Sequence, residues 1–384
     1  MTATHYKRDR VFWLIALQTG VFGIFMGGFG PAIPLLQSDQ GTSAAVAGLH
    51  GTALGIAAII AGYINAPLVH RFGRYKSLWI GSVIFNIGAF SFVIFPSPWQ
   101  TIPAILITGI GVSTIINNAF VYLTEHYGTE APSAVMQANG VNSFFFLLGN
   151  FIIGILAGTS ISWRLGLLLC IPFAIALYYF LGRSHVSVQV SISHERQSGS
   201  LPIRYWLSWL ALFFSIAGEF AIQFWSAALV RERTGLSAAT ATTLVLAFPL
   251  GMAIGRWFGA TIAPRLGIDA RLRSVMVLQL LGFIGFWFST SALLSFLMLL
   301  LVGLGTSVQF ALSTLRMLRI GFEKPDLAMG LSSLGAGIAI AGSPLALGIL
   351  ADNFGIVRGY FMVPILFSCA LLLVTLVPLR EGER

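Results

Sequence analysis

The stretch Gly41-Thr42-Ser43-Ala44-Ala45 recurs as Gly235-Leu236-Ser237-Ala238-Ala239, 194 positions later in a chain of 384 residues. The same ungapped shift superimposes further identical residues of the two halves: Arg71 on Arg265, Gly73 on Gly267, Gly109 on Gly303, Gly111 on Gly305, Ser113 on Ser307 and Arg164 on Arg358. One register over most of both halves indicates two copies of one module. In an apolar chain, such a repeat is typical of carriers built from paired helical bundles, which hold their solute at the interface of the repeats.

The composition is that of a membrane protein. Hydrophobic residues make up 57% of the chain and charged residues 9%, with a mean hydropathy of +0.87, whereas a soluble domain carries about 25% charged residues. Both cysteines, Cys170 and Cys369, lie in apolar runs and offer neither a disulfide framework nor a thiolate metal site. The net charge of +9 is spread over loops rather than gathered in a basic domain. We therefore expect contact with a lipid bilayer, no nucleic-acid partner, no metal and no cofactor.

Twelve apolar segments are long enough to cross a bilayer, which takes about 20 residues. Cutting the chain at charges and turn clusters places six of them in each half, at roughly 11–36, 44–69, 76–95, 99–124, 134–159, 164–182, 206–230, 239–262, 272–292, 294–318, 328–350 and 357–379. We predict an all-α polytopic membrane protein with two pseudo-symmetric six-helix bundles, residues 1–182 and 206–384. Residues 183–205, rich in Ser, Gln and Arg, are predicted to form a cytoplasmic linker between them.

The distribution of Lys and Arg predicts the orientation. With the N-terminus inside, sixteen of these residues fall on inner loops and four on outer loops, namely Arg164, Arg231, Arg233 and Arg358. Because inner loops carry the excess of positive charge, both termini are expected in the cytoplasm. The compact loops favour a prokaryotic source, so the expected location is the bacterial cytoplasmic (inner) membrane.

A basic turn joins the second and third expected spans, where residues 66–76 read APLVHRFGRYK. Together with the twelve spans and the repeat, this turn resembles the major facilitator superfamily of secondary transporters, and the resemblance covers nearly the whole chain. The family's turn carries an Asp that helps hold the cytoplasmic gate, and here that position is His70. The resemblance implies a gating role for the turn and its second copy: His70, Arg71, Gly73, Arg74, Arg265 and Gly267. The alternative is that these basic residues only set the topology.

Polar residues recur at helical spacing on otherwise apolar spans, and each such stripe must face protein or water. In the resembled family, the first, fourth, seventh and tenth spans line the solute cavity, and the stripes fall on these spans. They supply the candidate solute ligands Gln18, Asn117, Asn118, Gln223, Trp225, Gln309, Ser313 and Arg316. Arg316 ends its stripe, and anchoring at the membrane surface is an equal alternative for it.

Glu219 is the acidic residue that lies near the middle of a span. A titratable carboxyl group inside a membrane is costly and is a candidate proton carrier. The stretch around it, with Trp225 and residues 251–256, resembles sugar-permease-like branches of the superfamily, in which this Glu is tied to substrate or proton binding. The alternative is a fixed role in helix packing. Glu125, at the end of the fourth span, is the second candidate for proton coupling.

These features predict a proton-linked carrier that moves a small polar organic solute, sugar-like or an organic anion, by alternating access. A proton-linked drug or metabolite exporter and a membrane sensor on a transporter scaffold are the alternatives. The six histidines are scattered, and no nucleophile with its base is apparent, so an enzyme is not expected. The expected partners are the solute, protons and lipid, and the protein is expected to be a monomer.

Overall fold

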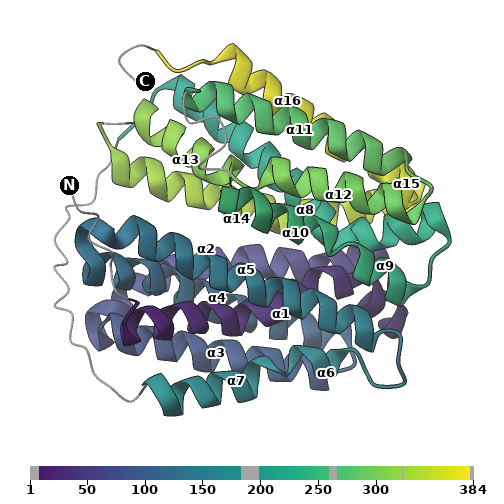
Figure 1. Ribbon diagram of the computed structural model, residues 1–384, viewed down its shortest axis with the longest axis horizontal. Coiled ribbons are helices and arrows are strands. Elements are labelled where there is room, and N and C mark those ends of the chain that lie inside the picture. Colours follow the sequence, from purple (N-terminus) through teal and green to yellow (C-terminus); the bar gives the residue numbers. More distant parts are fainter. Residues whose placement is uncertain (1–7, 183–198, 259–265, 322, 381–384) are drawn as a thin grey trace. The chain divides into compact units, whose positions relative to one another are not determined.

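The computed structural model describes residues 8–182, 199–258, 266–321 and 323–380, and this part of the chain is helical without strands (Figure 1). Most of the expected linker, residues 183–198, lies outside the described residues. The helices of the first sequence half are α1 (Arg10–Gln40), α2 (Ala44–Phe72), α3 (Arg74–Ile94), α4 (Pro98–Tyr127), α5 (Ala131–Leu156), α6 (Arg164–Leu167) and α7 (Cys170–Leu177). Short turns of 3₁₀ type (Gly128–Glu130) and π type (Tyr178–Gly182) follow α4 and α7.

The second half begins with α8, which at 32 residues is the longest helix described. Its helices are α8 (Ile203–Thr234), α9 (Ala238–Leu244), α10 (Ala247–Phe258), α11 (Ile268–Phe288), α12 (Ala292–Thr306), α13 (Gln309–Ile320), α14 (Pro325–Phe354), α15 (Ile356–Gly359) and α16 (Met362–Leu376). Twelve helical segments of the described chain are long and apolar enough to cross a membrane. Each overlaps one of the twelve segments expected from hydropathy, which confirms the predicted fold class.

Some spans are built from two helices in line. The tenth span, Ala292–Ile320, is one apolar segment, but α12 and α13 separate within it at Ser307 and Val308. Val308 has φ of −115° and ψ of −1°, far from ideal helical geometry, and the side chain of Ser307 bonds back to the carbonyl of Leu304 at 2.7 Å. A break of this kind exposes backbone groups that hydropathy alone does not reveal.

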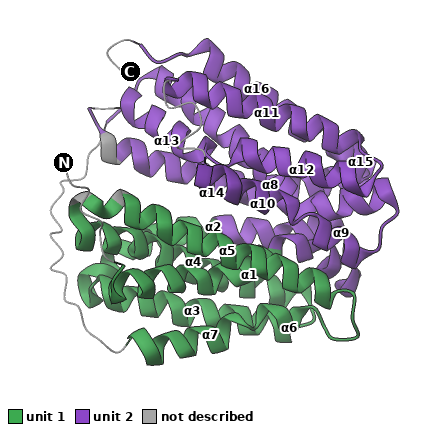
Figure 2. Cartoon of the chain, viewed as in Figure 1, with its two compact units in different colours: residues 1–29, 56–192 green, residues 30–55, 193–384 purple. Residues whose placement is uncertain are grey.

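The chain divides into two compact units, shown in Figure 2. Unit 1 comprises residues 1–29 and 56–192, and unit 2 comprises residues 30–55 and 193–384. The ends of α1 and α2 that join at Gly41 therefore belong with the second sequence half. The predicted division into bundles at residues 183–205 stays a prediction.

Repeated glycines mark close helix contacts at the same register in both halves. A Cβ atom at Gly111 of α4 would lie 2.3 Å from the backbone nitrogen of Phe85 on α3. The counterpart Gly305 of α12 stands in the same relation to Gln279 of α11, at 2.6 Å. Both distances are far below van der Waals contact, so only glycine allows these helix pairs to approach so closely. This shared contact explains why the repeat preserves these two glycines.

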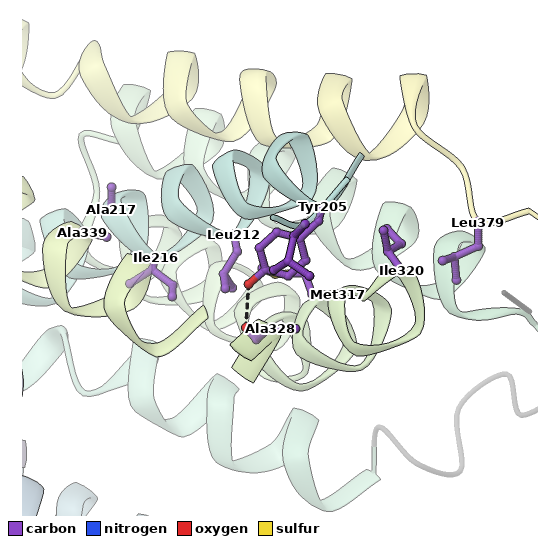
Figure 3. Close-up of a cluster of buried hydrophobic side chains, with 10 residues drawn as sticks. Tyr205, Leu212, Ile216, Ala217, Met317, Ile320, Ala328, Ala339 and Leu379 are labelled. Atoms are coloured by element: carbon purple, nitrogen blue, oxygen red, sulfur yellow. Dashed lines mark hydrogen bonds between the residues drawn. The ribbon is translucent and has the colours of Figure 1, made fainter. Parts of the chain in front are cut away.

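A hydrophobic cluster fills the end of unit 2 that the charge count places inside (Figure 3). Tyr205 of α8 lies fully buried at its centre, packed with Leu212 and with Met317 of α13. The Tyr205 hydroxyl donates a 2.6 Å hydrogen bond to the carbonyl of Ala328 on α14. The cluster thus fixes α8 against α13 and α14, the helices on which several candidate site residues lie.

Candidate functional site

In unit 1, the basic turn and the end of α4 form one polar network. The Arg74 guanidinium donates two hydrogen bonds to the Glu125 carboxylate, at 3.0 and 3.2 Å. A third bond of Arg74, at 3.4 Å, reaches the Asn118 side-chain oxygen, and the Asn118 amide donates to Asn65 of α2 at 2.7 Å. The network joins α2, α3 and α4 by a charge-assisted fork. It brings together Arg74 from the expected gate, Glu125 from the expected proton path and Asn118 from the expected solute ligands.

The other residues of the turn are arranged more simply. His70 and Arg71 are exposed, and the Arg71 guanidinium lies 5.3 Å from the ring centre of Phe72. Gly73 has φ of 78° and precedes α3, whereas its counterpart Gly267, which precedes α11, has φ of −63°. Arg265 lies outside the described residues.

In unit 2, α8 presents Glu219 and Gln223 on a half-buried face. The neighbouring positions are packed: a Cβ atom at Gly218 would meet the Phe367 ring at 2.2 Å, and the carbonyl of Ala221 accepts a hydrogen bond from Tyr360 at 3.2 Å. Glu219 and Gln223 are only partly covered, one helical turn apart. Glu219 lies at the middle of the 32-residue helix, so its carboxyl group sits deep in the span.

Arg256 of α10 is an exposed residue within electrostatic reach of Glu219. The two side chains interact electrostatically within unit 2. The Arg256 Nε also donates to the carbonyl of Ser307, at 3.4 Å, at the break between α12 and α13. An arginine near a partly covered carboxyl group in a span lowers the cost of its charged form. The site therefore combines a carboxyl group, a compensating cation and broken-helix backbone.

Gln309 belongs to a chain of buried hydrogen bonds between helices. Its side-chain oxygen accepts from Ser215 of α8, and its amide donates to Gln279 of α11 at 2.7 Å. The Gln279 amide donates to the Thr306 hydroxyl at 2.8 Å. All four side chains are buried. Each of these side chains has a hydrogen-bond partner among the others, so this hydrogen-bond network holds α8, α11, α12 and α13 together.

Arg316 is also fully engaged within unit 2. Its side chain is 1% exposed, and Nε donates a 2.8 Å bond to the Asp269 carboxylate at the start of α11. The two remaining nitrogens donate to the Ser208 hydroxyl, at 2.5 Å, and to the carbonyl of Val377 beyond α16. The other Asp269 oxygen accepts from the backbone of Leu379 at 2.6 Å. This arrangement joins α8, α11, α13 and the segment after α16.

The remaining expected ligands are placed separately. Trp225 is buried, and its indole donates a 2.9 Å bond to the carbonyl of Pro344 on α14. Ser313 is buried in α13, and Asn117 is partly buried on α4. Gln18 is buried in α1, donates to the carbonyl of Leu78 at 3.2 Å, and keeps its side-chain oxygen without a protein partner. Of the predicted ligands on α8, Gln223 alone shares the half-buried face of Glu219.

The structure adds residues that the stripes did not single out. Asp269 pairs with Arg316, Gln279 connects Gln309 to Thr306, and Asn65 holds Asn118. Asp269 could have been found, since it is an acidic residue two positions after Gly267, in the first turn of a helix that follows the second basic turn. Gln279 and Asn65 carry no comparable signal, because a single amide in a span has no preferred partner in sequence.

Comparison with known proteins assigns the family. A model described as Major Facilitator Superfamily matches residues 15–321. The chain belongs to the Major Facilitator Superfamily. It is thus a multi-pass membrane protein of a transporter family, as the repeat, the twelve spans and the basic turn predict.

Relatives of this superfamily member include both full-length and partial matches. It is 25% identical over 375 residues to the uncharacterized transporter YycB of Bacillus subtilis (strain 168), covering 92% of this chain and 90% of that protein. It is 29% identical over 171 residues to the sugar transporter ERD6-like 15 of Arabidopsis thaliana, covering 42% and 34%. It is 32% identical over 157 residues to the myo-inositol transporter 3A of Cryptococcus neoformans var. grubii, covering 38% and 26%. The match therefore spans about a third of the length of the sugar transporter and about a quarter of the length of the myo-inositol transporter.

Solved structures share the fold of this superfamily member. A crystal structure of a variant of the nucleoside transporter NupG has a TM-score of 0.78, at 13% identity, and covers 96% of this chain and 98% of that one. The xylose transporter XylE from E. coli, in a partially occluded inward open conformation, has a TM-score of 0.76 at 13% identity, covering 94% and 96%. At these identities, the likeness concerns the fold alone.

Proposed function

We propose that this superfamily member is a proton-coupled secondary transporter of a small neutral polyhydroxylated solute, a sugar or a cyclitol, in the cytoplasmic membrane. The observation that carries the proposal is Glu219, a carboxyl group at the middle of α8, on a half-buried face that it shares with Gln223. Such a group is costly inside a bilayer and is retained where it binds or carries charge. Arg256 interacts with it and offers the deprotonated form a counter-charge.

The class of solute depends on whether an arginine has hydrogen-bond donors left for a solute. A carboxylate solute would need an arginine with open donors. All three Arg316 nitrogens donate to Asp269, Ser208 or Val377, so this arginine does not offer a fork to a solute. Arg256 lies within electrostatic reach of Glu219, so an anionic solute would compete with that carboxyl group for it. A neutral solute therefore fits unit 2 better than an anion, and the relatives named for sugar and myo-inositol transport agree with this class.

We propose alternating access as the mechanism, with the two polar networks as its inner fastenings. Arg74 with Glu125 in unit 1, and Arg316 with Asp269 in unit 2, each tie helix ends on the side that the charge count places inside. In this proposal, protonation and deprotonation of Glu219 bias the carrier between its two orientations. The location of both termini in the cytoplasm belongs to the same proposal.

The test is uptake into proteoliposomes with an imposed pH gradient, with labelled myo-inositol and xylose as probes. Glu219→Gln keeps the shape of the side chain but cannot titrate. We expect it to abolish gradient-driven accumulation while leaving exchange of solute across the membrane intact. Glu323→Gln, which changes an exposed carboxyl group in the segment between α13 and α14, is the matched control and should accumulate solute like the wild type.

Three outcomes would revise the proposal. Full pH-driven accumulation by Glu219→Gln would move the proton to another carboxyl group, with Glu125 the next to test. Uptake of solute only when protons flow out of the vesicles would show that solute and proton move in opposite directions, as in a proton-linked exporter. Binding of the probes without any movement by the wild-type protein would indicate a sensor.

A further inference from the structure

An open pocket of about 650 Å³ lies at the ends of α1 and α8 that the charge count places outside. Its wall is formed by residues around Gln37 and Gly41 on one side, and around Arg231 and Gly235 on the other. All lining residues belong to unit 2, because this unit includes residues 30–55 together with the second half of the chain. None of the residues proposed for the proton or the solute takes part in it.

The residues that line the pocket fall in pairs 194 positions apart, the shift that relates the two halves of the chain. Gln37 corresponds to Arg231, Ser38 to Glu232 and Gly41 to Gly235, and both members of each pair line the pocket. Ile356 lies outside this pairing, and all other lining residues conform to it. Corresponding residues that face one cavity place it where the two repeats meet. In repeat-built carriers the solute passes at this junction, so the pocket lies at the mouth of such a path.

The chemistry of the wall favours a neutral ligand. The helices α1 and α8 both end at the pocket, with glycine caps Gly41 (φ 59°) and Gly235 (φ 67°), and helix carboxyl ends carry partial negative charge. Glu232 adds a negative charge, and Arg231 offsets these charges. A free anion would meet the two helix ends and the carboxylate, so it gains little from the single arginine.

Hydrogen-bonding groups complete the wall. Besides Gln37, the lining residues include Ser38, which carries a hydroxyl group, and the charged residues Arg231 and Glu232. The hydroxyl of Thr42, also in the wall, is covered and has no hydrogen-bond partner in the protein. Adjacent hydroxyl groups of a polyol donate and accept at once, which matches a wall with both kinds of group.

We infer that this pocket is a second, outer binding site for a neutral polyhydroxylated solute, occupied before or after passage through the membrane. The inference rests on the proposed function for its solute class and extends it to residues of the outer helix ends. Its central ligands are Thr42, Arg231 and Glu232, and Gln37 lines the pocket beside them. Binding there is weaker than at a closed central site, because the pocket is open to water.

The experiment measures protection of an introduced thiol. In a Cys170→Ala, Cys369→Ala background, Gln37→Cys is labelled from outside with a membrane-impermeant maleimide, in right-side-out proteoliposomes. Myo-inositol should slow the labelling several-fold, in a saturable way, and equal concentrations of gluconate, an anion of similar size, should not. Gln100→Cys, at an exposed position at the start of α4, is the matched control and should be labelled at a rate that no solute changes.

A second variant tests the role of charge. Arg231→Gln should remove the protection at Gln37→Cys, whereas Arg358→Gln, another arginine expected outside, should retain it. Equal protection at Gln37→Cys and Gln100→Cys, or none at Gln37→Cys with any neutral polyol tested, would overturn the outer site. Stronger protection by gluconate than by myo-inositol would overturn its proposed ligand class.

Uptake measured in parallel separates this inference from the proposed function. Uptake of myo-inositol without protection at Gln37→Cys overturns the outer site and leaves the transport proposal standing. Protection without uptake supports the outer site and contradicts the transport proposal. Protection that persists in Glu219→Gln, which should not accumulate solute, would show that the pocket binds independently of proton coupling.

Discussion

Two glycines at the same position of the repeat perform different tasks. Gly73 and Gly267 each precede the first helix residue after a basic turn, yet Gly73 has φ of 78° and ψ of 159°, and Gly267 has φ of −63° and ψ of 164°. The first conformation is rarely adopted by residues with a side chain, and the second is ordinary extended backbone. Sequence identity between the halves therefore does not imply the same structural need.

We predict opposite effects of alanine at these two positions. Gly73→Ala forces an unfavourable backbone conformation and should destabilise the protein by about 1–3 kcal/mol. Gly267→Ala meets no such strain, and space is open around its Cβ position, so it should be neutral or stabilise by up to about 1 kcal/mol. Thermal unfolding of the purified protein in detergent measures both. Equal losses in the two variants would contradict the assignment of backbone strain to Gly73.

At a second pair of corresponding positions, the two halves carry side chains of different chemistry. Asp269 and Arg316, which form the buried ion pair of unit 2, correspond in the 194-residue register to Tyr75 and Tyr122. The two tyrosine rings lie 6.3 Å apart in unit 1. The Tyr75 hydroxyl donates to the carbonyl of Gly182, as Arg316 donates to that of Val377. Each half thus fastens the end of its last span to its third and fourth spans, one by aromatic contact and one by charge.

The sequence could predict the fastening of unit 1 better than that of unit 2. Arg74 and Glu125 are charges at the ends of consecutive spans, and such residues meet when antiparallel helices pack. Arg316 ends a polar stripe, and a stripe only requires that its side faces protein or water. Whether that neighbour is a cavity or another helix depends on packing that helical periodicity does not contain. The polar stripe that ends at Arg316 therefore predicts that its residues are covered, but not whether they bind a solute.

At the scale of elements, the segment before α1 is fastened to the end of α4. The Asp9 carboxylate accepts from the Tyr127 hydroxyl at 2.7 Å and from the backbone nitrogen of Phe12 at 3.0 Å, and it contacts His126 at 2.6 Å. Burial raises the pKa of Asp9, but these hydrogen bonds and the charge of His126 outweigh burial and lower that pKa below 3.8. Asp9 thereby caps the first turn of α1 and joins it to α4.

This geometry predicts a pH-dependent contribution to stability. Because the folded-state pKa of Asp9 is lowered, its contribution is fully present above pH 3.8 and is lost as the pH falls through the folded-state value. Asp9→Ala should therefore destabilise the protein by about 0.5–2 kcal/mol near neutral pH, the usual cost of replacing a helix cap by alanine. The difference from wild type should shrink in acid. Thermal unfolding as a function of pH measures this difference.

The control for this prediction is Tyr127→Phe, which removes one hydrogen bond and keeps the carboxylate. It should cost less at neutral pH than Asp9→Ala, and its cost should also decline in acid. A difference between wild type and Asp9→Ala that stays constant across the acid range would show that the Asp9 charge contributes nothing to the contact.

At the scale of the whole molecule, hydropathy predicted the architecture because a bilayer allows few solutions. Every backbone group in a span must be bonded within the protein, so an apolar chain with twelve segments of sufficient length folds into helices. The breaks within spans, such as that at Ser307, were not predictable in the same way. A backbone group at such a break can bond to a residue distant in sequence, as the Ser307 carbonyl does to Arg256, and hydropathy contains no information on such partners.

Unit 2 combines residues 30–55 with the second sequence half, and Asp352 is central to the joint between them. Its two carboxylate oxygens accept hydrogen bonds from the backbone nitrogens of Ala44 and Ala45, at 2.8 and 2.7 Å, and so cap the first turn of α2. Further along the same contact, the Thr52 hydroxyl donates to the Ala341 carbonyl at 2.7 Å. In the register of the repeat, the position matching Asp352 is Gly158, so the chain has this carboxylate on one side only.

Under the proposed alternating access, opening to the outside separates α2 from α14 at this joint, and Asp352 opposes the separation. Losing a helix cap costs about 0.5–2 kcal/mol, which corresponds to a roughly two- to thirty-fold change in population. Asp352→Ala, which removes the cap, should therefore raise, within this range, the rate at which an impermeant maleimide labels Thr52→Cys from outside. Asn353→Ala, whose native side chain bonds only within α14, should leave that rate unchanged. Unaltered labelling in Asp352→Ala would mean that the close glycine contacts of α2 with Pro344 and Ala341 hold the joint without the carboxylate.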